Sequence, residues 1–486
     1  MTMGWMGLLA AASGDAAAFC GTYVGQAGAD LLNEASQMAV VRQDGVTTLT
    51  MVNDYSGELS DFAFVIPVPR GISEDNVRVA DEHLVRTLEV YSGPRLVSYT
   101  CADYGGWEDP RESAVNLPLQ ALPLTMAACS DNQITTEYSL DAGPYTGEEA
   151  DESAVTVEAT FAAGEYEFVV VSAEEGGGLS AWLEANGYAL GEDAEVLLGS
   201  YIDAGHDFLA AKVSLEAVPE GMTALSPIQL RYESQGFGLP LRLGTLNSPG
   251  TQDLILYTVT PVAQGAVGIA NYPQATLEDE CMVDLGEQPF AEWYEARVEE
   301  AFQAAEGFVW LDEYSWSVMP SYAAEFYANN MPKCDPCPSA HQFPANAGVS
   351  AEDPLPDAVL EGLGVELVEM EKDSGWWNLD PTLTIGRLHL RYDAAAVDQD
   401  LVLYTSGISD NQQMRFIQYS HAMESTFPIC GEGWVSEDPG HCEYGMQPTP
   451  VMGVASYGCS STRGTGAVGG LLGLVGALFL LRRRSS

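Results

Sequence analysis

Residues 37–69 read QMAVVRQDGVTTLTMVNDYSGELSDFAFVIPVP, and this stretch sets the expectation for the fold. Two strand-like runs, Met38–Arg42 and Thr47–Val52, flank the dipeptide Asp44-Gly45, which favours a tight hairpin turn. A third run, Phe62–Pro69, is rich in apolar residues and is closed by two prolines, as is typical of a buried strand. The stretch therefore predicts a β-hairpin followed by a buried strand.

Similar short runs recur along the chain and are separated by Gly, Pro, Asp or Asn. They are Ala154–Phe161, Tyr166–Val171, Phe208–Leu215, Ile228–Tyr232, Leu254–Val259, Arg387–Tyr392 and Leu401–Tyr404. The sequence thus predicts an α+β fold that is mainly β, with antiparallel, sandwich-like sheets and a few packed helices.

Two segments have helical patterns. Residues 179–190 suit a short helix with Ser180 as the N-cap. Residues 288–306 begin at Pro289, end before Gly307 and carry apolar and aromatic side chains at helical spacing. Since an aromatic stripe of this kind usually packs into a core, we expect the second helix to bury it.

The composition excludes several classes of function. The 486 residues suit two or three domains, and 19 Lys+Arg against 70 Asp+Glu give a net charge of −51. Such a chain repels phosphate backbones and anionic membrane surfaces, so we expect no nucleic-acid partner. The carboxylates are compatible with Ca²⁺, but no D-x-[DN]-x-[DN]-G loop occurs. A solvated acidic surface is the favoured interpretation.

The N-terminal stretch Met1–Ala18 resembles a secretory signal peptide. It is apolar, rich in small residues and ends in an A-x-A pattern at residues 16–18. It departs from the usual pattern because no Lys or Arg precedes the apolar part and because Asp15 lies near the cleavage position. The alternative is a buried N-terminal helix. We expect export.

The C-terminal tail, residues 456–486, combines Cys459, an uncharged run over 464–481 and the basic cluster Arg482, Arg483 and Arg484. Eighteen residues form a helix of about 27 Å, which is just long enough for a transmembrane span. This order resembles the MYXO-CTERM sorting tails that a myxosortase cleaves, which implies cleavage near Cys459 and display at the outer surface. A plain transmembrane anchor is the alternative, and both place residues 19–455 outside the inner membrane.

Eight further cysteines form an even set, compatible with four disulfides in an oxidising compartment. Proximity in the sequence favours Cys101–Cys129, Cys334–Cys337 and Cys430–Cys442, which leaves Cys20–Cys281. Such bonds would brace the fold, although eight cysteines allow 105 pairings.

The proline-rich segment 332–356 is expected to be a surface loop. It would separate a larger β-rich lobe, residues 19–331, from a smaller part of the same ectodomain, residues 357–455.

Local motifs give little chemistry. Cys334, Cys337 and His341 suit zinc or thiol exchange, but a structural disulfide is the favoured interpretation. No H-E-x-x-H or G-x-S-x-G occurs, and His389 alternates with two leucines, which predicts a polar strand face. Three aromatic groups suit stacking on a surface polysaccharide, with core packing as the favoured alternative. They are Trp310, Tyr314 and Trp316; Tyr322, Phe326 and Tyr327; and Trp376-Trp377.

Eight blocks of the sequence follow one another in a recognisable order: Phe19–Gly25, Asp61–Pro69, Ser92–Val97, Pro227–Leu243, Gln252–Tyr257, Ala270–Pro273, Cys334–Cys337 and Thr384–Tyr392. Taken in this order, they resemble an uncharacterised secreted bacterial family, domain of unknown function 2330. The resemblance runs from about residue 19 to about residue 425, and the acidic segment 141–153 departs from it. It implies an envelope address but no activity, cofactor or catalytic residue.

We therefore expect an exported, surface-anchored envelope protein with a structural, adhesive or ligand-binding role. The alternative is an extracellular hydrolase whose site is assembled from dispersed residues, since such sites need no local motif.

Overall fold

The computed structural model describes thirteen segments of the chain. They are residues 22–25, 32–56, 62–101, 155–186, 194–213, 225–247, 251–277, 282–286, 288–318, 357–367, 382–408, 412–419 and 446–454.

The first of two large sheets has five antiparallel strands. In spatial order they are β1 (Thr22–Gly25), β4 (Phe62–Pro69), β9 (His206–Val213), β8 (Tyr166–Ala173) and β7 (Val155–Ala163). The apolar run Phe62–Pro69 is therefore a strand, as predicted, and it lies between β1 and β9.

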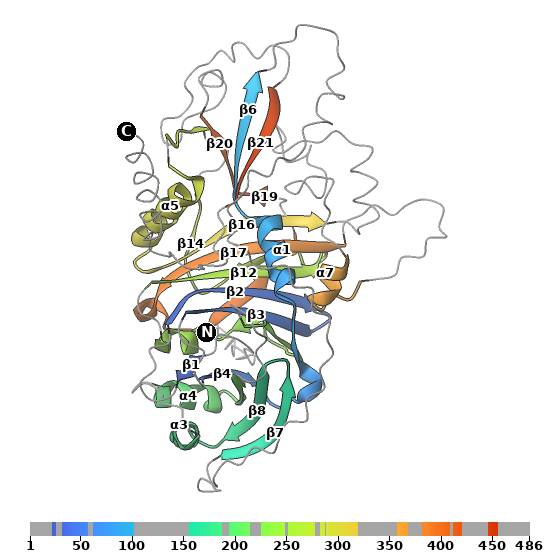
Figure 1. Ribbon diagram of the computed structural model, residues 1–486, viewed down its shortest axis with the longest axis vertical. Helices are drawn as coiled ribbons and strands as arrows, with labels where there is room; N and C mark the ends of the chain where they lie inside the picture. Colours follow the sequence, from blue (N-terminus) through green and yellow to red (C-terminus); the bar gives the residue numbers. More distant parts are fainter. Residues whose placement is uncertain are drawn as a thin grey trace, which may run out of the picture.

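The second sheet has nine strands and forms the middle of the molecule (Figure 1). In spatial order they are β14 (Gln274–Ala275), β16 (Phe308–Val318), β17 (Leu383–Asp393), β12 (Thr251–Pro261), β2 (Leu32–Gln43), β3 (Val46–Ser56), β10 (Ile228–Glu233) and β5 (Val77–Val79), with β19 (Gln412–Gln413) beside β16. The pairs β12–β2 and β14–β16 are parallel, so this sheet is mixed rather than purely antiparallel.

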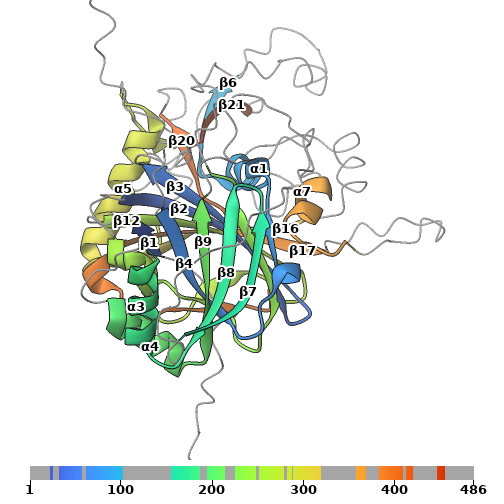
Figure 2. The same ribbon diagram turned by 60° about the horizontal axis from the view of Figure 1, so that its bottom comes forward.

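The two sheets pack face to face, as the sandwich-like prediction requires. Side chains from both inner faces share one core, with Met38, Leu49 and Leu388 on the larger sheet and Phe64 and Phe168 on the smaller one. Figure 2 shows the smaller sheet in front of the larger one. Burial of this interface is the main source of stability.

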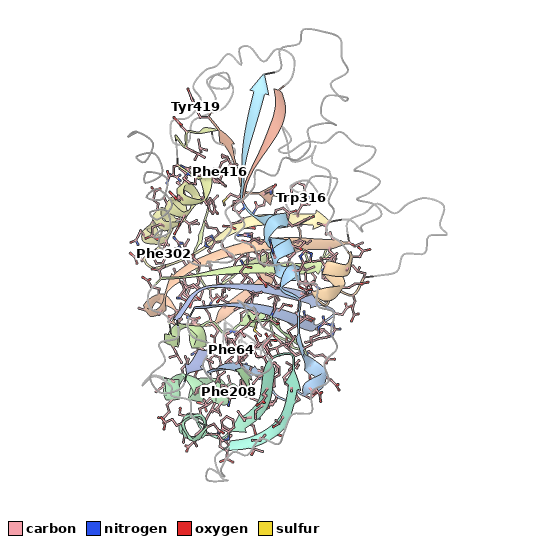
Figure 3. The ribbon with its side chains drawn as sticks, viewed as in Figure 1. Phe64, Phe208, Phe302, Trp316, Phe416 and Tyr419 are labelled. Carbon is pink, nitrogen blue, oxygen red and sulfur yellow. The ribbon has the colours of Figure 1, made fainter. Side chains whose placement is uncertain are left out.

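Five α-helices in the described segments cover the outer faces of the sandwich. They are α1 (Glu82–Ser92), α3 (Gly176–Ala185), α4 (Ala194–Asp203), α5 (Phe290–Ala304) and α7 (Asp357–Gly362). Helices α3 and α4 pack on the smaller sheet, around Phe208, which Figure 3 labels. Helices α1, α7 and α5 lie on the outer face of the larger sheet.

Two small sheets and three 3₁₀ turns complete the described structure. The first small sheet joins β11 (Gly238–Leu239), β18 (Leu401–Thr405) and β13 (Val267–Ile269). The second joins β15 (Met282–Val283), β20 (Arg415–Gln418), β6 (Arg95–Cys101) and β21 (Met446–Val454). The 3₁₀ turns are Glu74–Asn76, Arg242–Asn247 and Ala394–Ala396.

The helix predictions are confirmed in kind but not always in extent. Helix α5 has Pro289 as its N-cap and buries Phe290, Tyr294, Val298 and Phe302, so its aromatic stripe is core. Helix α3 begins earlier than predicted, at Gly176, and Ser180 is not its N-cap. A Cβ at Gly176 would lie 2.2 Å from the carbonyl oxygen of Glu195, so the close contact of α3 with α4 requires glycine at this position.

The proline-rich segment 332–356 and the acidic segment 141–153 lie outside the described residues. Strand β17, which follows the proline-rich segment in the sequence, lies between β12 and β16 in the interior of the larger sheet. Among the described helices the longest, α5, has 15 residues, and none has the length and apolar character needed to cross a bilayer.

Candidate functional site

Five charged residues gather on the outer face of the larger sheet, under helix α5. They are Asp253 on β12, Glu313 on β16, and Arg387, His389 and Arg391 on β17. We call them the buried charge cluster. Alternation along β17 explains the placement, because Leu388 and Leu390 point into the sandwich core and the residues between them point the other way.

Glu313 lies at a β-bulge in β16. Along β16, Asp312 pairs with Leu388 and Tyr314 pairs with Arg387, so Glu313 is an extra residue without a partner on β17. Its carbonyl oxygen instead accepts a hydrogen bond from the backbone N–H of Met414 at 2.8 Å. Glu313 keeps the outward face of Leu311, and the bulge shifts the alternation so that Tyr314 and Trp316 also point to that face.

The Glu313 carboxylate is fully buried and has three partners. Its Oε2 accepts a hydrogen bond from Arg387 Nε at 2.5 Å, and its Oε1 lies 2.8 Å from His389 Nδ1. Tyr294 of α5 donates its hydroxyl to the same Oε1 at 2.6 Å. A carboxylate with this many donors stays ionised in the core, and the pKa of Glu313 reflects two opposing effects. Burial raises that pKa, but Arg387 and His389 outweigh it and lower the pKa to about 2.

Asp253 lies on the opposite side of the His389 ring from Glu313. Its Oδ1 lies 2.9 Å from His389 Nε2, and its two oxygens accept hydrogen bonds from Arg391 Nε and Nη2, each at 2.8 Å. Burial raises the pKa of Asp253, whereas His389 and Arg391 lower it to about 2. Arg391 also reaches Glu299 of α5 at 3.2 Å, so the helix is held at a second point.

The hydrogen-bond pattern fixes the charge of His389. An ionised carboxylate can only accept, and each ring nitrogen faces one, so both nitrogens must carry a proton. Burial alone would lower the pKa of His389, but the carboxylates of Glu313 and Asp253 raise it to about 8. The cluster therefore holds an imidazolium between two carboxylates at neutral pH.

His389 lies on the polar face of β17 that the alternation predicted, together with Arg387 and Arg391. This face is opposite to that of Leu388 and Leu390, but it is covered by α5, and the side chain is 0 % exposed. The cluster can thus hold charge and a proton deep in the protein. Its four fully or nearly fully buried members, Glu313, Arg387, His389 and Arg391, face other protein groups rather than an open cleft.

A second polar site is open to solvent. A hollow of about 300 Å³ lies where β5 and β10 meet the turn that follows α7. Two arginines, Arg78 and Arg231, line it together with Asn76, Gln229, Glu361 and Glu366. We call this site the Arg78–Arg231 hollow.

Comparison with known proteins assigns the chain to a family. A family model described as "Uncharacterized protein conserved in bacteria (DUF2330)" matches residues 14–403. The chain belongs to this family. No curated protein and no solved structure matches it.

Most of the predicted site residues lie outside the part of the chain that the structure describes. Of the nine cysteines only Cys101 is described, as the last residue of β6, and its side chain is not among the described atoms. The disulfides, the zinc candidates Cys334, Cys337 and His341, and the tail residues Cys459, Arg482, Arg483 and Arg484 therefore stay predictions. Among the described residues no three His, Cys, Asp or Glu side chains are arranged to hold a metal ion.

The aromatic candidates divide in the same way. Trp310, Tyr314 and Trp316 lie on β16 and are almost completely buried, with Trp316 labelled in Figure 3. They are core residues, which agrees with the favoured interpretation. The other two groups, residues 322–327 and 376–377, lie outside the described segments.

Sequence reasoning missed both the buried charge cluster and the hollow. A signal for the cluster was present in TIGRLHLRY, where Arg387, His389 and Arg391 occupy every second position of a strand. Three cations on one strand face require anions opposite them or open solvent. The acidic partners come from residues 253 and 313, which no local pattern connects with the strand.

Proposed function

We propose that this chain is an exported, surface-anchored envelope protein whose β-sandwich is a rigid, non-catalytic scaffold for binding or adhesion. The proposed location at the cell surface rests on the two ends of the sequence, Met1–Ala18 and the tail 456–486. The scaffold role rests on the buried charge cluster.

One observation carries the scaffold role. The cluster uses its acid, base and cationic groups to connect strands β12, β16 and β17 with helix α5. Glu313, Arg387 and His389 are 0 % exposed, and each contacts another charged member of the cluster. Catalytic acids and bases must reach a substrate, whereas these side chains hold one another.

The energetics agree with a role in fixing the fold. A buried ion network adds little net stability compared with apolar residues of similar size, because desolvation offsets the attraction. It disfavours every arrangement that separates its members, since each unpaired buried charge costs several kcal/mol. Such a network suits a protein that must keep one shape.

The proposed location at the cell surface can be tested on whole cells. We would shave intact cells with a protease and map the peptides of the envelope protein under non-reducing conditions. We expect accessible ectodomain peptides, a mature start at Phe19, a processed Cys459 and a bonded Cys334–Cys337 pair. Peptides that appear only after cell lysis would contradict surface display.

The scaffold role can be tested by complementation. A strain that lacks the gene should show an envelope defect, such as detergent sensitivity. A Glu313→Gln variant should restore resistance at temperatures at which its circular dichroism shows it folded. A folded variant that fails to restore resistance would instead support the hydrolase alternative, with Glu313 as a reacting group. A deletion strain without any envelope defect would contradict the structural role.

A further inference from the structure

We propose that the Arg78–Arg231 hollow binds a small hydroxylated monocarboxylate, such as a uronate sugar. The inference stands on the geometry of the hollow and does not depend on where the protein is located.

Strand pairing brings the two arginines to one place. Arg78 of β5 pairs with Gln229 of β10, and Arg231 is two residues further along β10, on the same face as Gln229. Diagonal neighbours of this kind lie close enough for long side chains to act on one ligand. The chain has only 19 Lys and Arg residues, and two of them line this hollow, beside the carboxylates of Asp75, Glu361 and Glu366.

Neighbouring groups hold Arg78 in position without using all of its donors. Its Nε donates to Gln229 Oε1, and its Nη2 donates to the carbonyl oxygen of Gly362 at 2.9 Å. Gln229 is itself fixed, because its Nε2 donates to Thr50 Oγ1 at 2.7 Å. Among the described residues, Nη1 of Arg78 has no hydrogen-bond partner, so a positioned guanidinium edge is left for a ligand.

Arg231 already pairs with a carboxylate of the protein at this site. Its Nη2 donates to Glu366 Oε1 at 2.6 Å, which is a short charge-assisted bond. Glu366 is 72 % exposed, so the contact lies at the rim of the hollow and can exchange with an incoming carboxylate. The Nε of Arg231 has no partner among the described residues.

The positive charges of Arg78 and Arg231 also repel each other when no anion is bound in the hollow. Burial lowers the pKa of Arg78, and the nearby charge of Arg231 lowers it further. A bound carboxylate would relieve this repulsion and could accept from both side chains, as planar guanidinium groups favour.

The rest of the lining selects the kind of anion. Asp75, Glu361 and Glu366 contribute three carboxylates, so an anion with two charges, such as sulfate, meets more repulsion than one with a single charge. The same carboxylates can accept hydrogen bonds from ligand hydroxyls. A volume of about 300 Å³ is at the small end for ligand sites, and only Val77 and Val365 are apolar, so the ligand is small and polar.

The test is isothermal titration calorimetry on the purified full-length chain at constant ionic strength. The probes are glucuronate, acetate, glucose and sulfate. We expect glucuronate to bind saturably, acetate to bind at least about tenfold more weakly, and glucose to give no saturable signal. Sulfate should bind more weakly than glucuronate.

Matched variants connect the binding to the hollow. Arg78→Gln and Arg231→Gln should each weaken glucuronate binding about 10- to 100-fold, because each loses charge-assisted hydrogen bonds. Arg297→Gln, which removes an exposed arginine on α5, should leave the affinity unchanged.

Glu366→Gln should have the opposite effect. It removes the carboxylate that competes for Arg231, so glucuronate should bind about 3- to 10-fold more tightly. The turn should keep its place, because Gln43 holds the backbone of residue 366 through two hydrogen bonds. A merely structural role of the two arginines predicts no such gain.

Three outcomes would overturn the proposal. The first is no saturable glucuronate signal in the millimolar range. The second is sulfate binding as tight as that of glucuronate, which would contradict the carboxylate class. The third is unchanged affinity in both Arg78→Gln and Arg231→Gln while circular dichroism shows both proteins folded.

Discussion

His389 is a positively charged side chain in the interior of a strongly acidic protein. Its two ring nitrogens face Glu313 and Asp253 at 2.8 and 2.9 Å, and neither contact is available to the residue in an unfolded chain. The raised pKa is therefore a property of the folded state, so the protonation of this ring and the stability of the fold must depend on each other.

The first prediction is a loss of stability at mildly alkaline pH. With a folded-state pKa of about 8 against 6.5 unfolded, the contribution of His389 is complete below about pH 6.5 and disappears as pH rises through about 8. The difference corresponds to about 2 kcal/mol of unfolding free energy. Urea unfolding from pH 6 to pH 9 measures it.

Histidine variants provide the control for this measurement. The exposed His83→Gln variant should keep the alkaline decrease in unfolding free energy, whereas His389→Gln should be less stable at pH 6 and should lack the decrease. The assignment is wrong if His389→Gln shows the same pH dependence as the unmodified chain.

A second prediction at this scale concerns Gly364, in the turn over the Arg78–Arg231 hollow. Its φ is +90°, and a Cβ would lie 2.8 Å from Thr48 Cγ2. Gly364→Ala should cost about 1–3 kcal/mol from the backbone conformation together with the clash. Thermal unfolding measures the cost. Gly71→Ala has a similar φ of +86° but no atom within 4 Å, so its smaller cost isolates the backbone part.

At the scale of elements, the bulge in β16 and helix α5 act together. The bulged segment carries Glu313, and the helix supplies Tyr294 as its third donor. The two elements are also adjacent in the chain, since α5 ends at Ala304 and β16 begins at Phe308. The cluster thus fixes the orientation of a helix–strand pair against β17.

The third prediction is that the single variant Glu313→Leu is less stable to unfolding than the double variant with Arg387→Met. Glu313→Leu leaves Arg387 and His389 without their shared carboxylate and should cost about 3–5 kcal/mol. Adding Arg387→Met removes the cation that has lost its Glu313 partner, whereas His389 keeps Asp253, so the second change should recover part of that loss. Chemical denaturation of the single and double variants measures the difference. Glu300→Leu, an exposed position on α5, should change stability by less than about 0.5 kcal/mol.

The prediction is contradicted if the two changes are additive. The double variant would then lose as much unfolding free energy as Glu313→Leu and Arg387→Met lose together, and the two side chains would not interact. The ion network would then not connect β16 with β17.

The sequence predicted elements well where one pattern decided them. Asp44-Gly45 indicated a hairpin, and the structure has both residues at positive φ between β2 and β3. The spacing in residues 288–306 indicated α5. Strand β16 was not predicted, because its bulge breaks the alternation of inward and outward side chains.

The candidate sites could not be predicted in the same way. The members of the buried charge cluster come from residues 253, 313 and 387–391, and the arginines of the hollow come from residues 78 and 231. Their proximity follows from sheet order, including a parallel pairing of β2 with β12, which a local pattern does not encode. Local patterns also placed His389 on a polar face without indicating that α5 covers it.

At the scale of the whole molecule, charge is the dominant feature. The net charge of −51 means that most acidic side chains repel one another in the folded state, while the buried charge cluster is shielded from solvent. Added salt should therefore act on the surface and leave the cluster unchanged.

The fourth prediction is that sodium chloride stabilises the protein. Raising it from about 0.01 M to about 0.5 M shortens the screening length several-fold, so the melting temperature should rise. Differential scanning calorimetry measures the shift. Sucrose at matched osmolality is the control for solvent exclusion, and a melting temperature that falls with salt would contradict self-repulsion as the dominant surface term.

The order of strands in the larger sheet has a consequence for how the chain is made. Strand β17 lies between β12 and β16, and β12 also pairs with β2, more than 200 residues earlier. The sheet cannot close until residue 393 has left the ribosome, so the early strands wait with unpaired edges for most of translation. Contacts this distant in sequence make folding slow. Until then the nascent chain exposes unpaired strand edges, which makes it prone to aggregation.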